Sequence, residues 1–294
     1  MTYAIVSRSI PRDWRILYTD PNSPASEDVN GRPKLRRGSR ILEIDGVDFL
    51  MGITEAEIDT LNAGLNPQTP GESHIFKVRD PDGVERTITL TAADVTVSAM
   101  NRVKILNTTS GDVGYILLNT FGANSAEIEM AAAMTQLKNA GVTDLVLDLR
   151  YNGGGFLAIA AQTAYMIAGP TRTDNKDFVR LTINDNPANP FRNRDLNDPF
   201  FSEGLGFSLT PGVSLVDLDL DRVFILSTGD TCSASEAVIN GLRGIGVEVI
   251  LIGGRTCGKP YAFIGTDNCG DTYYTIQFGS ANDMGFGDYA DGFS

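Results

Sequence analysis

One stretch of this sequence joins a short apolar strand to a helix through a turn of small polar residues. The strand covers Arg222 to Leu226, whose β-branched and aromatic residues form a run too short for a buried helix. The turn covers Asp230 to Glu236, and residues 237–243 after it have helical spacing. Such a turn presents its side chains and its unpaired amides at the C-terminal edge of a sheet. The stretch therefore indicates an α/β layer with a candidate functional site at the turn.

Ser233, within this turn, has two interpretations. Ser233 and Glu236 have the S-x-x-E spacing of a capping box, in which the hydroxyl accepts a first-turn amide and the carboxylate reaches back. The alternative is a nucleophile held at the end of a strand. Capping serines far outnumber catalytic ones, so the turn taken alone favours the capping interpretation.

The charge balance argues against several classes of partner. The chain has 24 basic and 37 acidic residues, which gives a net charge of −13, and it has no basic stripe. This charge argues against nucleic acid or an anionic membrane surface as a partner. The sequence has no apolar run of about eighteen residues and no signal peptide at its start. We therefore expect either a cytoplasmic protein or a piece of a longer chain.

The cysteines and the histidine limit the chemistry. Cys232, Cys257 and Cys269 lack the spacing of zinc ligands, so we expect no metal site. One disulfide and one free thiol would fit an oxidising compartment, and the pairing stays open. The single histidine, His74, lies in an alternating strand pattern far from the turn in sequence. A serine nucleophile at the turn would therefore need a base other than histidine.

Residues 1–99 have the pattern of a small β-rich unit. Strands are expected at residues 14–18, within 35–47, at 74–79 and at 86–90, and Thr54 is the expected N-cap of a short helix. Two motifs stand out in this region, Asn22-Ser23-Pro24-Ala25 and Leu35-x-x-Gly38-Ser39-x-Ile41-Leu42-x-Ile44-Asp45-Gly46. With these motifs the region resembles a PDZ domain of the kind associated with bacterial proteases.

The PDZ resemblance implies that this unit grips the C-terminal end of a polypeptide by strand addition. A loop of backbone amides would hold the carboxylate, and in this chain the loop is expected at Thr2 to Ile5. Since this position lies at the very start, we expect the natural protein to extend further upstream.

From Val103 the sequence alternates between strand and helix patterns. A strand at residues 114–118 precedes a helix that is expected to begin with a capping box, Asn124-x-x-Glu127, and to end at Gly141. The apolar residues of that helix, Met130, Met134 and Leu137, are expected in the core.

The next strand, at residues 144–150, runs into Tyr151-Asn152-Gly153-Gly154-Gly155 before a helix at residues 156–168. Three consecutive glycines leave backbone amides open to a close approach by a ligand. Both glycine spacings of the nucleotide-binding loops are missing, so we do not expect a nucleotide.

The remaining segments supply a surface excursion and a second loop at the sheet edge. Residues 169–221 are polar and weakly periodic, which is typical of a surface excursion, here expected over a cleft. Residues 247–252 form another buried strand, and the loop after it carries Lys259. Because two neighbouring strands of one layer end in small-residue loops, we expect Ser233 and Lys259 to meet at one sheet edge.

Four motifs follow one another in order along the chain: Gly114-Tyr115-Ile116 with Phe121, Leu147-Asp148-Leu149-Arg150-x-Asn152-Gly153-Gly154-Gly155, Ser233-Ala234-Ser235-Glu236, and Thr256-x-Gly258-Lys259. With these motifs the chain resembles the C-terminal processing peptidases, or tail-specific proteases, of serine peptidase family S41. The resemblance covers nearly the whole chain. It implies a PDZ domain at residues 1–99 and a crotonase-like or ClpP-like α/β peptidase core at residues 100–294, trimmed at both ends.

The resemblance also implies roles for individual residues. Ser233 would be the nucleophile and Lys259 the general base, since an amine can accept the serine proton once an apolar pocket keeps it neutral. The oxyanion donors would be the amide of Ala234 with those of Gly154 and Gly155. Glu236 would support the loop and Thr256 would orient the lysine amine. No metal and no cofactor are required.

Two positions depart from the family pattern. The fourth residue after the lysine is Phe263, where the family often has Gln, and Gly244 stands where some members carry an acidic residue. The third member of the catalytic site is therefore not identified by the sequence.

The predicted function is a serine endopeptidase that hydrolyses unfolded or C-terminally presented polypeptides through an acyl-enzyme. The resemblance implies work in the periplasm or cell envelope. Two alternatives stay open. One is a catalytically inactive relative that binds hydrophobic ligands or peptide ends, and the other is a PDZ scaffold whose core only docks partners.

Overall fold

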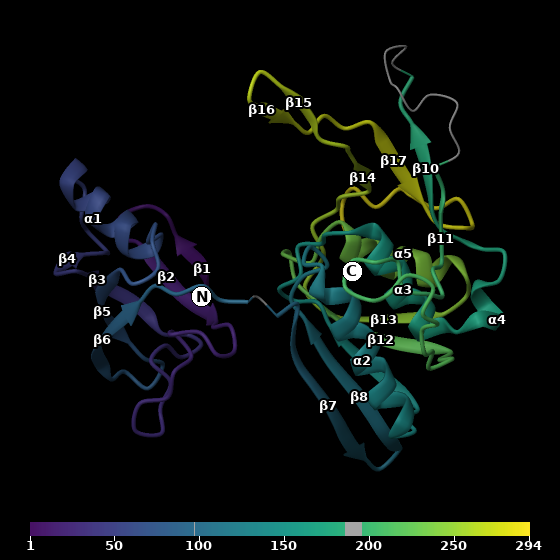
Figure 1. The fold of residues 1–294 in the computed structure, drawn as a ribbon, viewed down its shortest axis with the longest axis horizontal. Helices are drawn as coiled ribbons and strands as arrows, with labels where there is room; N and C mark the ends of the chain where they lie inside the picture. Colours follow the sequence, from purple (N-terminus) through teal and green to yellow (C-terminus); the bar gives the residue numbers. More distant parts are fainter. Residues whose placement is uncertain (97, 186–195) are drawn as a thin grey trace. The chain divides into compact units, whose positions relative to one another are not determined.

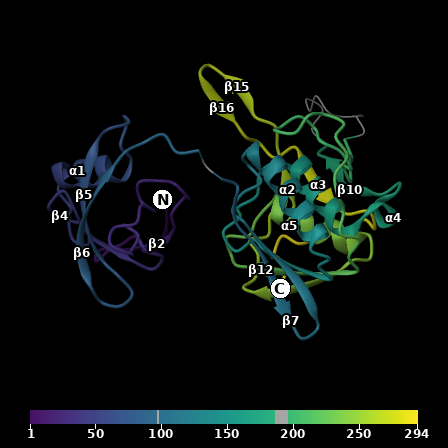
Figure 2. The same ribbon diagram turned by 60° about the horizontal axis from the view of Figure 1, so that its bottom comes forward.

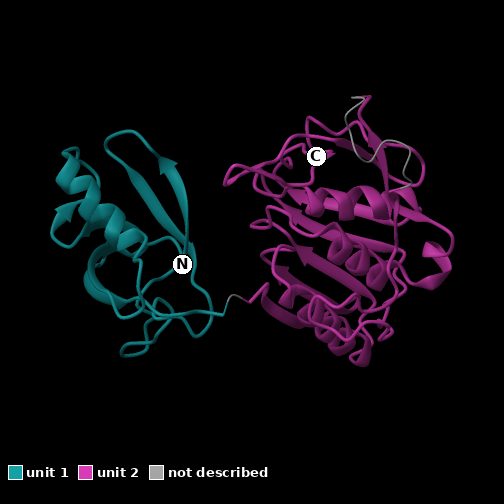
Figure 3. Cartoon of the chain, turned by 45° about the horizontal axis from the view of Figure 1, so that its top comes forward, with its two compact units in different colours: residues 1–97 teal, residues 98–294 magenta. Residues whose placement is uncertain are grey.

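The computed structural model describes residues 1–96, 98–185 and 196–294. The chain divides into two compact units, residues 1–97 and residues 98–294 (Figure 3). The sequence predicts a division after residue 99, close to this boundary. The first unit is rich in strands and the second has a mixed α/β architecture. The predicted fold class, an α/β core preceded by a β-rich unit, is confirmed.

The first unit is a sheet with one helix. Its elements are β1 (Thr2–Ser7), β2 (Asp13–Tyr18), β3 (Arg40–Ile44), β4 (Val47–Asp48), α1 (Glu55–Leu65), β5 (Ser73–Arg79) and β6 (Glu85–Thr91). The strands pair antiparallel in the order β1-β2-β3-β5-β6, with β4 against β3. A cluster of buried apolar side chains, among them Ile41, Phe76 and Val78, forms the core of the unit.

Two local expectations in this unit have different outcomes. Thr54 caps α1 as predicted, because its hydroxyl accepts the Glu57 amide at 3.3 Å while the Glu57 carboxylate accepts the Thr54 amide at 2.9 Å. The loop expected at residues 2–5 is instead the edge strand β1, because these residues pair with β2. His74 lies on β5, and its Nδ1 is 2.6 Å from the Asp45 carboxylate of the same unit.

The second unit is organised by a five-stranded sheet. Its strands are β7 (Met100–Thr108), β8 (Gly111–Leu118), β9 (Asp144–Asp148), β12 (Arg222–Ser227) and β13 (Glu248–Gly253), in the order β13-β12-β9-β8-β7. All of these strands are parallel except β7, which pairs antiparallel with β8. Because Leu226 lies opposite Asp148 and Ser227 lies opposite Gly253, the loops that follow β9, β12 and β13 leave the same edge of the sheet.

Helices connect these strands within the described residues. They are α2 (Ser125–Asn139), α3 (Leu157–Ala168), α4 (Pro170–Thr173) and α5 (Ala234–Gly244). The helices α2, α3 and α5 lie side by side against the sheet (Figure 1, Figure 2). Met130, Met134 and Leu137 of α2 are fully buried in the core, as predicted. Among the described residues, no helix combines the length and the apolar character that a membrane crossing would need.

The capping box predicted at the start of α2 is wrong. Asn124 makes no side-chain cap, and the fully buried Glu127 turns toward a distant loop. Its carboxylate accepts the amides of Leu205, Ser208 and Leu209 at 2.6 to 2.8 Å. Burial alone would raise the pKa of Glu127, but these amides together lower it below its usual value. The capping box does not form because three amides that are distant in sequence satisfy the Glu127 carboxylate better than one cap amide would.

A second, smaller sheet lies beside the helices. It consists of β11 (Asp198–Pro199), β10 (Asp177–Ile183), β17 (Phe278–Ala281) and β14 (Tyr261–Ala262), in that order. The strands β15 (Thr266–Asn268) and β16 (Asp271–Tyr273) form a hairpin that follows β14 and precedes β17 in the chain. This hairpin projects away from the smaller sheet (Figure 1). The surface excursion predicted at residues 169–221 therefore contains α4, β10 and β11, while its residues 186–195 lie outside the described residues.

Candidate active site

Ser233 stands in a strained turn between β12 and α5. Its backbone has φ 57° and ψ −114°, in the left-handed range that a residue with a side chain rarely adopts. A sharp strand-to-helix turn of this kind exposes a side chain at the top of a sheet. Glu236 supplies the return bond of the predicted capping pair, since its carboxylate accepts the Ser233 amide at 3.0 Å.

The glycine loop after β9 packs directly on this turn. A Cβ atom on Gly154 would lie 2.8 Å from both the Cys232 carbonyl oxygen and the Ser233 Cβ, and its φ is +105°. Neither contact nor that conformation suits a residue with a side chain. Glycine at position 154 therefore lets the loop reach the serine.

Asn152 is the centre of the glycine loop, and the sequence did not single it out as a site residue. Its buried side-chain oxygen accepts the Gly154 amide at 2.9 Å. Its backbone carbonyl accepts the Cys232 amide at 3.2 Å and the Ser235 hydroxyl at 2.9 Å. Ser235 thus fastens the glycine loop to the turn at residues 230–236, the serine turn.

The predicted oxyanion amides differ in their bonding. The Gly154 amide is already bonded to Asn152. The amides of Gly155 and Ala234 have no acceptor in the part of the chain that the structure describes. Ala234 is the first residue of α5, where helix geometry leaves amides unpaired. Two of the three predicted donors are therefore open to a ligand oxygen.

The Asp148 and Arg150 motif anchors the base of the glycine loop. The Arg150 guanidinium binds the fully buried Asp148 carboxylate through two bonds of 2.9 and 2.7 Å. Burial raises the pKa of the Tyr115 hydroxyl to about 12, and so does its hydrogen bond to Asp148. The backbone oxygen of Arg150 accepts the Thr228 hydroxyl at 2.6 Å, which ties this anchor to the end of β12.

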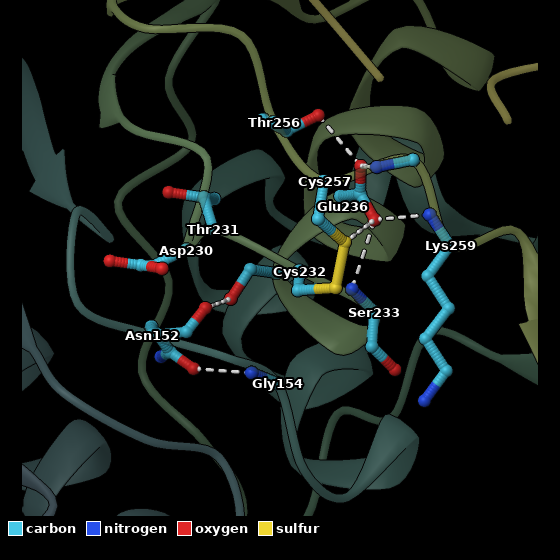
Figure 4. Close-up of a disulfide and its surroundings, with 12 residues drawn as sticks. Asn152, Gly154, Asp230, Thr231, Cys232, Ser233, Glu236, Thr256, Cys257 and Lys259 are labelled. Atoms are coloured by element: carbon cyan, nitrogen blue, oxygen red, sulfur yellow. Dashed lines mark hydrogen bonds between the residues drawn. A yellow bond between two sulfur atoms is a disulfide. The ribbon is translucent and has the colours of Figure 1, made fainter. Parts of the chain in front are cut away.

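Glu236 joins the serine turn to the loop at residues 254–260 that carries Lys259, the lysine loop. Its fully buried carboxylate accepts the amides of Ser233 and Lys259 on one oxygen, at 3.0 and 2.8 Å. The other oxygen accepts the Gly258 amide at 2.7 Å and the Thr256 hydroxyl at 2.6 Å. The predicted role of Glu236 as loop support is consistent with this geometry (Figure 4).

The Thr256 hydroxyl faces Glu236 and not the lysine amine that it was expected to orient. Besides donating to Glu236, its oxygen accepts the Phe293 amide at 2.7 Å. Both interactions are buried, and the carboxylate that accepts the Thr256 hydroxyl also accepts the Lys259 amide.

A disulfide joins Cys232 to Cys257 and so links the same two loops (Figure 4). This settles the pairing that the sequence left open, and Cys269 is free and exposed. Cys232, Glu236 and Cys257 offer metal-ligand atoms within 4.8 Å of one another. In this structure those atoms are committed to the disulfide and to the four hydrogen bonds of the carboxylate.

Ser233 and Lys259 line one cavity of about 250 Å³, together with Gly155. Figure 4 shows both side chains extending to the same side, away from the disulfide. The Lys259 Nζ lies 4.7 Å from the centre of the Phe263 ring, the position where the resemblance leads one to expect Gln.

Two residues that line this cavity, Ser280 and Tyr289, were not foreseen from the sequence. Burial raises the pKa of the Tyr289 hydroxyl to about 12. Both residues come from the C-terminal segment that includes β17, and the family motifs stop before it. No pattern in the sequence marked them.

The comparisons with known proteins agree with this architecture. The family model described as peptidase family S41 matches residues 112–263, more than half of the chain. The chain therefore belongs to peptidase family S41. This span includes the glycine loop, the serine turn and the lysine loop.

Two curated relatives are processing proteases. The chloroplastic C-terminal processing peptidase of Tetradesmus obliquus is 26% identical over 84% of this chain and 48% of its own length. The carboxyl-terminal-processing protease of a Picosynechococcus species is 28% identical over 81% of this chain and 49% of its own length. The chain thus spans about half the length of the curated relatives it matches.

Solved structures share the fold. A Bacteroides fragilis protein assigned to the S41 proteases superposes with a TM-score of 0.71 at 24% identity, covering 100% of this chain and 72% of its own. The photosystem II D1 C-terminal processing protease gives a TM-score of 0.53 at 20% identity, covering 100% of this chain and 69% of its own. At these identities the likeness concerns the fold alone.

We expect Gly154→Ala to destabilise the protein by about 2–4 kcal/mol, because the new Cβ adds backbone strain and a clash with the serine turn. Gly153→Ala is the matched control, since a Cβ there would meet no atom within 4 Å. Thermal unfolding should show a fall in Tm of about 5–10 °C for the first variant and little change for the second. Equal melting temperatures would contradict the close packing of the two loops.

Proposed function

We propose that this chain is a serine peptidase in which Ser233 attacks the peptide carbonyl and Lys259 is the general base. The observation that carries the proposal is that Ser233, in a strained strand-to-helix turn, shares one cavity with Lys259. Membership of peptidase family S41 supports a hydrolytic role. The only histidine of the sequence is hydrogen-bonded to Asp45, while Lys259 lines the cavity with the serine.

The reaction follows from these positions. Neutral Lys259 accepts the Ser233 proton as the oxygen attacks, and passes it to the departing amine of the substrate. The acyl group stays on Ser233 until water, deprotonated by the same lysine, releases it. Glu236 supports both steps, since it binds the backbone amides of nucleophile and base.

The developing oxyanion would be bound by the amides of Gly155 and Ala234. Neither amide has an acceptor among the described residues, and Ala234 opens α5, whose N-terminal end favours negative charge. In this proposal Gly154 shapes the loop and Asn152 holds its amide, so Gly154 contributes through its missing side chain.

The first unit is proposed to bind the C-terminal end of the substrate polypeptide. A cavity of about 190 Å³ lies between the start of β1 and the end of α1, and its wall is largely apolar. Met1, Leu65, Phe76 and Leu90 are among the residues that line it. Because β1 is an edge strand, its free side can pair with an extended peptide whose last side chain enters this cavity.

The proposal assigns the chain to the periplasm or the cell envelope. The family resemblance supports this assignment. The disulfide supports it as well, because such bonds persist in oxidising compartments.

A second candidate function is a binding protein without catalysis. The contact between the Lys259 amine and the Phe263 ring favours it, since an aromatic face stabilises an ammonium ion while catalysis needs the neutral amine. Such a protein would hold an apolar ligand or peptide end in the cavity and release it unchanged.

We expect Ser233→Ala to abolish labelling by a fluorophosphonate and to lower cleavage of an unstructured peptide by roughly a thousandfold or more. Lys259→Ala should lower both rates by a similar factor, because the serine loses its base. Labelling is read by mass spectrometry of the modified peptide, and cleavage by chromatography of the products.

Ser202→Ala and Lys104→Ala serve as controls, because both side chains are exposed in the same unit. Both controls should keep the rates of the parent chain. Tight ligand binding by a parent chain that is neither labelled nor active would reject the peptidase proposal and support the binding protein.

For the first unit we expect Leu65→Glu to weaken binding of a fluorescent peptide by roughly tenfold or more, since it places a charge in an apolar cavity facing the peptide carboxylate. Leu65→Met keeps the volume and should bind as the parent chain does. Fluorescence anisotropy with the Ser233→Ala chain measures binding without turnover. A peptide with an amidated C-terminus should bind weakly, and equal binding of both peptides would refute recognition of the carboxylate.

A further inference from the structure

The disulfide has a specific position relative to the two reactive residues. Cys232 directly precedes Ser233, and Cys257 lies two residues before Lys259. Their Cα atoms are 5.2 Å apart, and the bond closes a separation of 25 residues. The bond therefore joins the serine turn to the lysine loop next to the cavity that both residues line.

The other connections between these loops depend on few atoms. The Cys257 amide donates to the Thr231 carbonyl at 3.0 Å, and the remaining bonds pass through the Glu236 carboxylate. One oxygen of that carboxylate, Oε2, binds the amides of both Ser233 and Lys259. The disulfide is the covalent member of this small set.

Cys257 also lies against that same oxygen. Its Sγ is 3.3 Å from the Glu236 Oε2. A disulfide sulfur carries no proton, so in this state the contact is not a hydrogen bond. After reduction a thiol would occupy the position and would compete for the oxygen, while a thiolate would repel it. Reduction thus removes the tether and disturbs the acceptor that holds both loops.

One end of the bond lies on an exposed residue. Cys257 is exposed and Cys232 is half-buried. Thiol–disulfide exchange requires access of this kind to one of the sulfurs.

We propose that Cys232 and Cys257 are positioning residues for Ser233 and Lys259, so that a dithiol reductant lowers the reactivity of the serine. This inference rests on the proposed function. In the exchange, the dithiol forms its own disulfide and gives two electrons and two protons to the bond between Cys232 and Cys257. Both cysteines are left as thiols, and an oxidant of the disulfide class reverses the step.

The test compares the oxidised chain with the same chain reduced by dithiothreitol. Hydrogen exchange should show faster exchange at the amides of Ser233 and Lys259 after reduction. The rate constant for fluorophosphonate labelling of Ser233 should fall by roughly tenfold to a hundredfold well below the melting temperature. Reoxidation with oxidised glutathione should restore both.

Two variants sharpen this test. The double variant Cys232→Ala with Cys257→Ala should label slowly and should not respond to dithiothreitol. Cys269→Ser removes the exposed free thiol and should respond as the parent chain does.

The outcomes separate this inference from the proposed function. Unchanged exchange at residues 233 and 259, or a lower Tm with an unchanged labelling rate, would overturn the inference, because a purely structural disulfide behaves in that way. Another outcome is that the probe labels neither the oxidised nor the reduced chain while reduction still speeds the exchange. That result would support positioning by the disulfide and would reject the peptidase proposal.

Discussion

One buried carboxylate determines the geometry of the candidate site. Glu236 is fully buried and receives four donors from two segments of the chain: one from its own helix start and three from the loop after β13. A carboxylate in that position costs free energy unless every oxygen is satisfied, so the two loops must keep their places for the helix to begin where it does. The strained backbone conformation of Ser233 persists because the Glu236 hydrogen bonds and the disulfide at Cys232 together hold it.

The parallel sheet brings the pieces of this network together. The strands β9, β12 and β13 are neighbours in register, so the glycine loop, the serine turn and the lysine loop leave one edge. Asn152 fastens the first loop to the second, and Glu236 fastens the second to the third. This arrangement leaves the amides of Gly155 and Ala234 without an acceptor among the described residues, and it places Ser233 and Lys259 on one cavity. The chemistry proposed for the chain uses these four groups.

The sequence allowed the prediction of features that depend on neighbours in the chain or on the direction of strands. The strands and helices of residues 114–168 and 222–252, the cap at Thr54, the buried face of α2 and the exit of the Ser233 and Lys259 loops from one sheet edge are of this kind. Features that depend on distant partners were missed. Glu127 has the spacing of a cap, yet amides about eighty residues away bind it. Thr256 faces a carboxylate and not the lysine, and Tyr289 reaches the cavity from a segment without a recognisable motif. A local pattern does not reveal which of several acceptors a donor meets after folding.

The proposed chemistry depends most directly on Glu236, which holds the nucleophile Ser233 and the base Lys259 in place. In Glu236→Gln one oxygen becomes an amide nitrogen, so two of the four donors lose their acceptor. The measurement is the second-order rate constant for fluorophosphonate labelling of Ser233 in this variant, compared with the parent chain and with Glu248→Gln, whose side chain is exposed on β13. We expect this rate constant to fall roughly a hundredfold in Glu236→Gln with the fold retained, and not to fall in the control. An unchanged rate constant in Glu236→Gln would contradict the role of Glu236 in positioning Ser233 and Lys259.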